Sequence, residues 1–338
     1  MSNFAVPKQL DKYIYKYNKV MKKLVLSLLT IAAATATGVA ADKVVPLKFG
    51  DFDQWVTRHI KESAVIGGKT KTIYEIGPTR TIDGAKAYNP GSSPWATSNV
   101  YAKVMGVVKT SNAVFPDTHG SGKCVKMTTM LEHVKAVGII NMDVLVSGSI
   151  FLGQMFEPVS STKNPYSKME MGIPFTQRPK YLQFDYKLNA PTGNRTYSSG
   201  FGAKKTVQGR DYAEVYILLQ RRWEDSKGNL HAARVGTGRQ RFGATTANWV
   251  NKYRIEVWYG DASTHKGYQS YMGLLNTKDR AYYARNSKGK MVPVIEEQWD
   301  DANATPTHML VMASSGCGTA YVGTLGMTLW LDNVALVY

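Results

Sequence analysis

The sequence predicts an all-β protein, built as an antiparallel β-sandwich or jelly roll. Three observations support this fold class. Apolar and polar residues alternate along many short segments, clusters of Gly, Asn, Asp and Ser separate these segments, and only residues 53–62 and 276–284 carry enough helical periodicity for a turn or two of helix. Many short strands joined by turns bury their apolar faces most simply as two packed sheets.

The clearest predicted strands lie in the middle of the chain. Residues 180–188, 213–220 and 253–260 read KYLQFDYKL, AEVYILLQ and YRIEVWYG. Successive side chains of a strand point to opposite faces, so every second residue should be buried. We expect the apolar face of each segment to point into the core: Leu182, Phe184, Tyr186 and Leu188, then Val215, Ile217 and Leu219, then Tyr253, Ile255, Val257 and Tyr259.

Turn residues predict how the strands connect. Residues 225–229 (DSKGN) lie between two strand-like runs and predict a hairpin loop. Long polar stretches at 66–95, 157–172 and 189–212 predict loops across the ends or face of the sandwich. Because no repeat or low-complexity linker interrupts residues 42–338, we expect a single jelly-roll domain with long loops there.

The last predicted strand, GMTLWLDNVALVY, changes its apolar face part-way along. Apolar residues fall on one face before Asp332 and on the other face after Asn333: Leu329 and Leu331, then Val334, Leu336 and Tyr338. A β-bulge adds one residue to a strand and thereby exchanges its faces. We therefore predict a small bulge at Asn333, with Asp332 as an ordinary surface residue.

An alternative interpretation makes Asp332 a ligand of a structural calcium ion. Calcium collects carboxylate and backbone oxygens. The partner would be Asp53 or Asp51 in FGDFDQW, near the other end of the predicted domain. First and last strands of a jelly roll often lie side by side, so one ion could be shared between them.

Residues 21–41 have the pattern of a secretory signal peptide. Lys22 and Lys23 precede an apolar run that ends on the small residues Ala40 and Ala41. Cleavage near Ala40 or Ala41 would export the protein to the periplasm, the cell surface or the medium. Residues 1–20 are then an upstream extension or a misplaced start. The run is diluted by threonines, so we expect no transmembrane span in the mature protein.

The chain is strongly basic. It has 42 basic and 25 acidic residues and a net charge of +17; residues 1–41 hold six of the lysines and one aspartate, which leaves 36 basic and 24 acidic residues, or +12, in 42–338. The densest basic patch is residues 221–241 (RRWEDSKGNLHAARVGTGRQR). An exported protein rarely meets nucleic acid, so we expect no nucleic-acid partner. An acidic polysaccharide, a lipid surface or a merely solvated basic face fits better.

Two cysteines, Cys124 and Cys317, leave two alternatives open. An oxidising compartment would allow a disulfide between them. They could equally be two buried thiols, because the sequence does not give the distance between their Cα atoms.

No catalytic signature is found in the sequence. A glycosidase needs two carboxyl groups that flank the scissile bond, and no Glu-x-Asp-x-Glu pair places them on one strand. There is also no Gly-x-Ser-x-Gly elbow and no histidine pair at metal-binding spacing. Glu214 and Glu256 are isolated candidates for carboxylates that converge from separate strands. Each more commonly would form a surface ion pair.

Aromatic residues are better candidates for binding. The C–H face of a sugar ring stacks on the flat face of tryptophan or tyrosine, beside polar groups that bond its hydroxyls. Aromatic residues on polar strand faces or in loops are Trp95, Trp223, Trp258, Tyr282, Tyr283 and Trp299. We select Trp95, Trp223 and Trp258 as ligand-binding candidates, with Asp261 close to Trp258. The structural alternative is that each ring is buried in the core, as most large aromatics are.

Four segments carry a family resemblance. They resemble the putative carbohydrate metabolism domain family, secreted β-jelly-roll proteins of Gram-negative gut bacteria: FGDFDQW (49–55), SGSIFLGQM (147–155), MGIPFTQRPKYLQFDYK (171–187) and the final segment 306–338. The resemblance implies a fold similar to carbohydrate-binding modules and a role in glycan handling. Modules of similar fold often share a calcium between an early acidic residue and the aspartate of a closing D-N-V, which would be Asp53 and Asp332 here. The early position is usually glutamate, and this chain has the shorter aspartate.

The sequence thus predicts an exported jelly-roll protein that binds or handles carbohydrate. One alternative is a glycoside hydrolase or lyase whose carboxylates converge from separate strands. Another is a structural or adhesive surface protein that binds an anionic polymer through its basic face.

Overall fold

The computed structural model describes residues 41–338, except 105, 137–139, 161–163, 201 and 318. Lys43–Tyr338 form one compact unit. The expected upstream extension (1–20) and, apart from Ala41, the expected signal peptide (21–41) lie outside the described residues. Within the described part, no helix has the length and hydrophobicity needed to cross a membrane.

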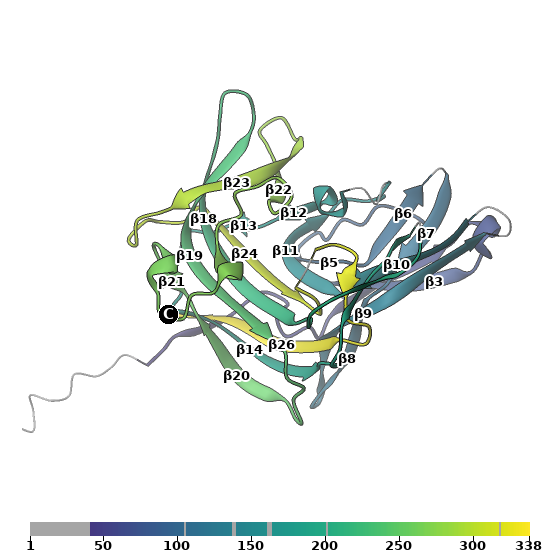
Figure 1. The fold of residues 1–338 in the computed structure, drawn as a ribbon, viewed down its shortest axis with the longest axis horizontal. Helices are drawn as coiled ribbons and strands as arrows, with labels where there is room; N and C mark the ends of the chain where they lie inside the picture. Colours follow the sequence, from purple (N-terminus) through teal and green to yellow (C-terminus); the bar gives the residue numbers. More distant parts are fainter. Residues whose placement is uncertain (1–40, 105, 137–139, 161–163, 201, 318) are drawn as a thin grey trace, which may run out of the picture. The chain divides into compact units, whose positions relative to one another are not determined.

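The predicted all-β fold is confirmed, and the first of its two large sheets has eight strands (Figure 1). All of its described ladders are antiparallel, as predicted for a sandwich. In spatial order the strands are β16 (Ser199–Gly200), β10 (Ile140–Ser147), β9 (Gly122–Ala136), β26 (Thr328–Val337), β14 (Tyr181–Asn189) and β20 (Val250–Glu256), with β8 (Val114–His119) paired to β9 and β1 (Val44–Pro46) paired to β26.

The second large sheet has ten strands and closes on itself. Its order is β13 (Ile173–Pro174), β24 (His308–Ser314), β18 (Ala213–Glu224), β19 (Leu230–Phe242), β23 (Met291–Trp299), β22 (Tyr282–Arg285), β12 (Met169–Met171), β11 (Ser149–Met155) and β5 (Trp95–Thr97), with β21 (Trp258–Tyr259) paired to β19. Strand β11 pairs with β12 on one side and also with β24, so the strands from β24 to β11 form a ring. This ring covers the face of β18 that points away from the sandwich.

Three small sheets and four short 3-10 helices complete the described chain. The sheets are β3–β2–β4 (Thr70–Ile76, Trp55–Lys61, Arg80–Asp83), β6–β7 (Val100–Val104, Val107–Ser111) and β17–β15–β25 (Lys205–Val207, Arg195–Tyr197, Val322–Gly323). The 3-10 helices are η1 (Ala64–Ile66), η2 (Pro165–Lys168), η3 (Ala262–Thr264) and η4 (Ser270–Met272).

Two expectations about irregular segments were wrong. Residues 53–62, expected to include a helical turn, contain strand β2, because its residues pair along their whole length with β3. The polar stretches 66–95, 157–172 and 189–212 are not plain loops, since they contain β3 and β4, β12, and β15 to β17 respectively. Except for β12, which lies between β22 and β11 in the ten-stranded sheet, these strands sit in small sheets or at a sheet edge, where a half-exposed ladder tolerates a polar sequence.

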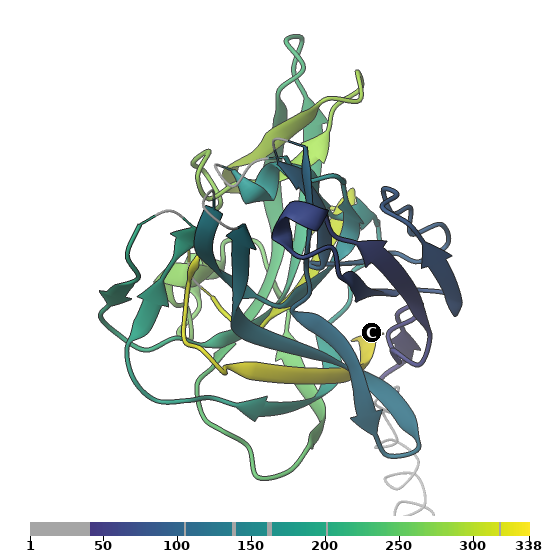
Figure 2. The same cartoon turned by 90° about the vertical axis from the view of Figure 1, so that its right-hand side faces the viewer.

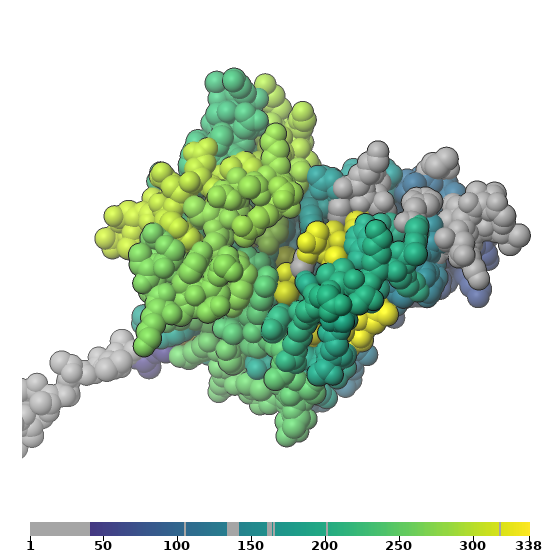
Figure 3. Space-filling view, viewed as in Figure 1, coloured from purple at the N-terminus to yellow at the C-terminus, as the bar shows by residue number. Residues whose placement is uncertain are grey.

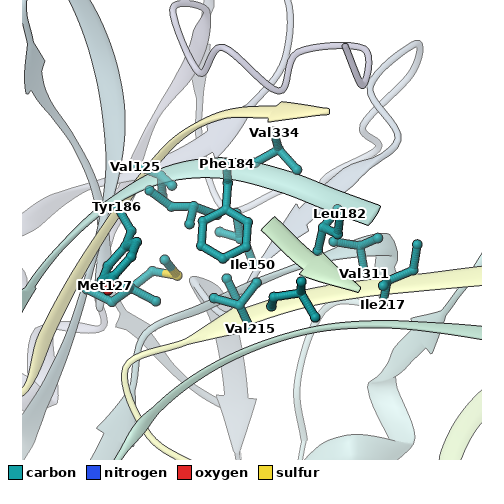
Figure 4. Close-up of a cluster of buried hydrophobic side chains, with 14 of the residues drawn as sticks. Val125, Met127, Ile150, Leu182, Phe184, Tyr186, Val215, Ile217, Val311 and Val334 are labelled. Carbon is teal, nitrogen blue, oxygen red and sulfur yellow. The ribbon is translucent and has the colours of Figure 1, made fainter. Parts of the chain in front are cut away.

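The main core lies between the two large sheets. Figure 4 shows side chains of β14 meeting side chains of β18 and β24 across the gap. The predicted inward faces are confirmed, because their residues either belong to this cluster or pack against it: Leu182, Phe184, Tyr186, Leu188, Val215, Ile217, Leu219, Tyr253, Ile255, Val257 and Tyr259. Each fully buried aliphatic or aromatic side chain contributes about 1.5–3 kcal/mol to folding.

The predicted hairpin between β18 and β19 is confirmed. The backbone amide of Asp225 donates to the carbonyl of Asn229, and Gly228 has a φ of 85° that suits glycine. The hairpin extends beyond the sandwich in Figures 1 and 2.

The bulge predicted in the last strand is also confirmed, but Asp332 is not a surface residue. The β14–β26 ladder shifts its register between Gln183 and Asp185, and Asn333 has a φ of 52°. Asp332 is 5% exposed. Its neighbours on β8 and β14 cover it, and its carboxylate accepts hydrogen bonds from His119 Nδ1 (2.6 Å) and the Asn333 amide (2.7 Å).

The two cysteines do not form a disulfide. Cys124 is buried and Cys317 is half-buried, and both are free thiols. Burial raises the pKa of each thiol, to about 12 for Cys124 and about 11 for Cys317, so neither is a reactive thiolate at neutral pH.

Candidate functional site

The outer face of β18 and β19 carries a charged cluster. Glu214 lies between the core residues Ala213 and Val215, so its side chain points away from the sandwich. Arg241 is its direct cross-strand partner, and Arg239 is the next residue along the same face. All three side chains therefore lie together on one surface of the ten-stranded sheet.

Glu214 is held by both arginines. Arg239 donates from Nε and Nη2 to the two Glu214 oxygens at 3.0 and 2.8 Å, and Arg241 donates from Nε to Oε1 at 2.8 Å. Burial lowers the pKa of Arg239, but the charge and hydrogen bonds of Glu214, together with Tyr282 and Tyr216, outweigh it, so the net pKa is raised. Arg239 therefore stays charged, and the cluster has two cations for one anion.

A cavity of about 470 Å³ opens beside this cluster. We call it the Tyr271 cavity, and its described lining residues are Tyr212, Gln240, Arg241, Gly267, Gln269, Tyr271 and Met272. The segment that carries β21, η3 and η4 forms one wall; it is the green region on the near face of Figures 1 and 3. The opposite wall comes from β19 and from the residues that precede β18.

Arg241 is fixed at three points in the wall of this cavity. Its Nε donates to Glu214, its Nη2 donates to the Cys317 carbonyl at 3.1 Å, and its guanidinium carbon lies 4.3 Å from the centre of the Tyr271 ring. A cation over an aromatic face is attracted by the ring quadrupole. Burial raises the pKa of Tyr271, so its phenol is neutral at neutral pH.

Two of the predicted binding residues border the cavity without lining it. A β-carbon placed on Gly267 would lie 3.1 Å from the Trp258 ring, so Trp258 packs directly behind the cavity wall. Trp258 also stacks on His265, with ring centroids 4.6 Å apart. Asp261 begins η3 by accepting a hydrogen bond from the Ser263 amide at 2.9 Å. Both residues belong to the segment that forms the wall.

The other two predicted tryptophans lie elsewhere. The expectation that Trp95 is accessible was wrong, since its side chain is 1% exposed. Trp95 packs edge-on against Phe52 in the main core and donates a hydrogen bond from Nε1 to the Lys48 carbonyl. Trp223 is 38% exposed on the β18–β19 hairpin, where it stacks on His231. The structure does not bring Trp223 to the Tyr271 cavity.

Glu214 and Glu256 do not form the carboxylate pair that a glycosidase would need. Glu256 is exposed at the end of β20 in the eight-stranded sheet, between the core residues Ile255 and Val257, and accepts a hydrogen bond from Trp258 Nε1. Glu214 is on the outer face of the ten-stranded sheet. Each points away from the core on its own sheet, so the two do not share a cleft.

The expected calcium ligands have other partners. Asp53 is exposed and accepts a hydrogen bond from the Lys123 amide at 2.7 Å, while both oxygens of Asp332 are bonded to His119 and Asn333. Among the residues described, no group of three or more His, Cys, Asp or Glu side chains could hold a metal ion. The carboxylates of Asp53 and Asp332 are thus bonded to protein donors, which does not favour a calcium ion between them. Calcium binding stays an untested prediction.

A second cavity of about 540 Å³ lies between η2, the hairpin that joins β22 to β23, and the residues that follow β11. It is lined by Phe156, Glu157, Ser167, Lys168, Arg285, Gly289, Lys290 and Met291. Arg285 covers its one aromatic ring at 5.0 Å from the centroid and pairs with Glu170 at 2.8 Å. Arg285 therefore covers one face of the Phe156 ring, as Arg241 covers one face of the Tyr271 ring.

Sequence reasoning missed most of the cavity residues. Tyr271 and Gln269 lie in an irregular segment with no periodicity to indicate their direction. Arg241 and Gln240 are inside the dense basic patch 221–241, which was the available signal, but their pairing with Glu214 and Val215 depends on a register shift that the sequence does not indicate. Part of that patch is paired inside the protein, since Arg234 is buried against Glu296, whereas Arg221 pairs with Asp300 and stays about half exposed.

A family model described as putative carbohydrate metabolism domain matches residues 70–337. The chain belongs to the putative carbohydrate metabolism domain family. The family description relates this protein to carbohydrate metabolism without fixing a reaction. No match is found among curated proteins.

Two solved structures are similar to this member of the family. One is a crystal structure of a putative glycoside hydrolase from Bacteroides thetaiotaomicron, 18% identical, with a TM-score of 0.40, covering 80% of this chain and 76% of its own. The other is a putative glycoside hydrolase from Bacteroides vulgatus, 13% identical, with a TM-score of 0.39, covering 87% of this chain and 94% of its own.

Proposed function

We propose that the protein binds carbohydrate in the Tyr271 cavity. The observation that carries this proposal is the combination of tyrosine faces with amide and guanidinium donors in one concave site. Tyr271 and Tyr212 supply the aromatic surface, and Gln240, Gln269 and Arg241 supply the polar groups. The volume, about 470 Å³, is within the usual range of small-ligand sites, ~300–1,000 Å³.

The chemistry of the cavity suits a sugar. One face of a pyranose ring presents C–H groups that pack on an aromatic ring, while its hydroxyls both donate and accept hydrogen bonds. The glutamine amides offer donors and acceptors, and Arg241 offers donors only. Because Arg241 is already fixed by protein contacts, a ligand loses little free energy in ordering it.

The geometry supports binding rather than hydrolysis. Both oxygens of Glu214 are occupied by arginine donors, so the carboxylate is not positioned as a general acid. None of the described lining residues is a carboxylate. A glycosidase would need two, about 5–9.5 Å apart.

We infer that this binding takes place outside the cytoplasm, in the periplasm or at the cell surface, as the signal-peptide pattern of residues 21–41 suggests. Residues 42–338 would then act as one glycan-binding domain, in keeping with a family related to carbohydrate metabolism. Detection of the mature N-terminus near Ala41 or Asp42 in exported protein, by mass spectrometry, tests this inference.

A glycan array followed by calorimetric titration tests the binding site. Tyr271→Ala should weaken the affinity for the best glycan about tenfold or more, roughly 1.4 kcal/mol, whereas Tyr271→Phe should retain most of it. Trp223→Ala is the matched control, because it removes an exposed aromatic ring far from the cavity. If the array is silent, or if Tyr271→Ala binds as well as the unchanged protein, the site is not where we place it.

A further inference from the structure

The Tyr271 cavity is cationic. Arg241 is the one charged residue among its described lining residues. Glu214, the carboxylate behind it, is shared with Arg239, so the three side chains together carry one net positive charge. A ligand in the cavity therefore meets the guanidinium of Arg241, and the next carboxylate behind this wall is the buried Asp211, which accepts hydrogen bonds from the Tyr212 and Cys317 amides.

One nitrogen of the Arg241 guanidinium is free to donate a hydrogen bond to a ligand. Its Nε and Nη2 are bonded to Glu214 and to the Cys317 carbonyl, and Nη1 has no acceptor among the described residues. The two hydrogen bonds from Arg239 Nε and Nη2 hold the Glu214 carboxylate in place. Glu214 in turn holds Arg241 against the Tyr271 ring. An arginine held in this way presents Nη1 to the ligand without having to reorient.

Arg239 supplies an independent sign that the cluster is incomplete. Its side chain is more than nine-tenths buried, yet its Nη1 has no hydrogen-bond partner among the described residues. Leaving a buried donor unsatisfied costs about 1–3 kcal/mol, and more when the group is charged. Such a donor in a native protein is generally bonded to water or to a ligand. Arg239 lies over the Tyr216 ring, 4.9 Å from its centre, and is not one of the described lining residues of the Tyr271 cavity.

We propose that the Tyr271 cavity takes an acidic sugar, one that carries a carboxylate or a sulfate group. This inference rests on the proposed carbohydrate-binding function and specifies its ligand class. The anionic group accepts a hydrogen bond from Arg241 Nη1, and the sugar ring packs on the tyrosine face. A charge-assisted hydrogen bond is roughly twice as strong as a neutral one, so the acidic sugar is favoured over its neutral counterpart.

Matched ligand pairs test the inference. One pair is an oligogalacturonide and its methyl ester; the other is a sulfated disaccharide and its desulfated form. At 150 mM salt, where long-range attraction to a basic protein is largely screened, the acidic member of at least one pair should bind about tenfold more tightly. The pair that shows the preference identifies the anionic group.

Two variants locate the preference. Arg241→Gln should bring the acidic and neutral members of the pair to the same affinity, even where it weakens the binding of both, and Arg241→Lys should retain part of the preference. Lys187→Gln is the control, because it removes the same formal charge from the outer face of the eight-stranded sheet, next to Trp330. It should leave the preference intact.

The outcomes separate this inference from the proposed function. Equal affinity for both members of both pairs, with binding still lost in Tyr271→Ala, overturns the acidic-sugar inference and leaves the carbohydrate site standing. A preference that survives Arg241→Gln but is lost in Lys187→Gln also overturns it. Binding that is insensitive to Tyr271→Ala overturns both.

Discussion

Arg58 illustrates how single buried side chains set the properties of this protein. Its Nη1 donates to Glu75 at 2.9 Å and its Nη2 donates to Glu157 at 2.6 Å, and all three side chains are almost fully buried. Burial raises the pKa of Glu75 to about 8; Arg58 opposes the shift, and the charge of Glu157 adds to it. One arginine cannot neutralise two carboxylates, so Glu75 holds its proton in the folded state.

This shift predicts how stability depends on pH. The folded-state pKa of Glu75 is above its ordinary value of 4.5, so its contribution to stability is present below pH 4.5 and is lost as the pH rises to about 8. Glu75→Gln, which is neutral at every pH, should gain stability relative to the unchanged protein by roughly 2–4 kcal/mol between pH 5 and pH 8. Denaturant unfolding of both proteins at several pH values measures this difference.

The comparison isolates Glu75 from other titrating groups. Burial, aided by the nearby charge of Arg222, lowers the pKa of His308 to about 4, so His308 makes the protein lose stability as the pH falls below about 6.5. This effect is common to both proteins and cancels in their difference. Parallel pH curves for Glu75→Gln and the unchanged protein would contradict the assignment of the proton to Glu75.

At the scale of the strand, the bulge in β26 depends on a residue that tolerates a positive φ. Asn333 does so, and its side-chain amide also donates to Asp185 at 2.8 Å. Asn333→Gly keeps the backbone and loses the hydrogen bond, whereas Asn333→Val loses both, because a β-branched residue is strained at this φ. Thermal or denaturant unfolding should show Asn333→Val to be less stable than Asn333→Gly by about 1–2 kcal/mol. Equal stabilities would show that the bulge relaxes at no cost.

A buried ion pair braces the segment that carries Tyr271. Glu296 accepts hydrogen bonds from Arg234, from Gln220 Nε2 at 2.6 Å and from the Leu275 amide at 2.7 Å, and neither charged side chain is exposed. Glu296→Gln leaves Arg234 as an uncompensated buried charge. The free energy of unfolding should fall by about 3–5 kcal/mol. A change under 1 kcal/mol would mean that water reaches this pair.

A bulge also explains why the site was only partly predictable. Counting back from the 225–229 turn with an unbroken ladder places Glu214 opposite Gln240, and Arg241 on the other face. The β18–β19 register shifts by one residue between Leu219 and Gln220, which brings Arg239 and Arg241 to the face of Glu214. Alternation identified the inward faces of β14 and β18 because it is local. Trp95 was misplaced because its burial depends on Phe52, which is distant in sequence.

For the molecule as a whole, the absence of a disulfide between Cys124 and Cys317 gives a simple prediction. The melting temperature should change by no more than about 1 °C when a reducing agent is added, because a disulfide would typically contribute about 2–4 kcal/mol. A drop of several degrees would show that the two thiols are oxidised in the folded protein.

The distribution of charge over the molecule also bears on which ligand the protein binds. Several arginines of the basic patch are neutralised by Glu214, Glu296 and Asp300, so the net charge of the chain says little about its ligand. What remains specific is the Tyr271 cavity, which combines a fixed guanidinium with two tyrosine rings. The central claim is therefore that the ligand binds in the Tyr271 cavity. Affinity measurements alone test this location only indirectly.

The most direct test is a crystal structure of the protein soaked with its best-binding glycan. We predict a sugar ring packed on Tyr271, with an acidic group within hydrogen-bond distance of Arg241 Nη1. A glycan bound instead at Trp223, at Trp330 or in the cavity lined by Lys168 and Lys290 would contradict it.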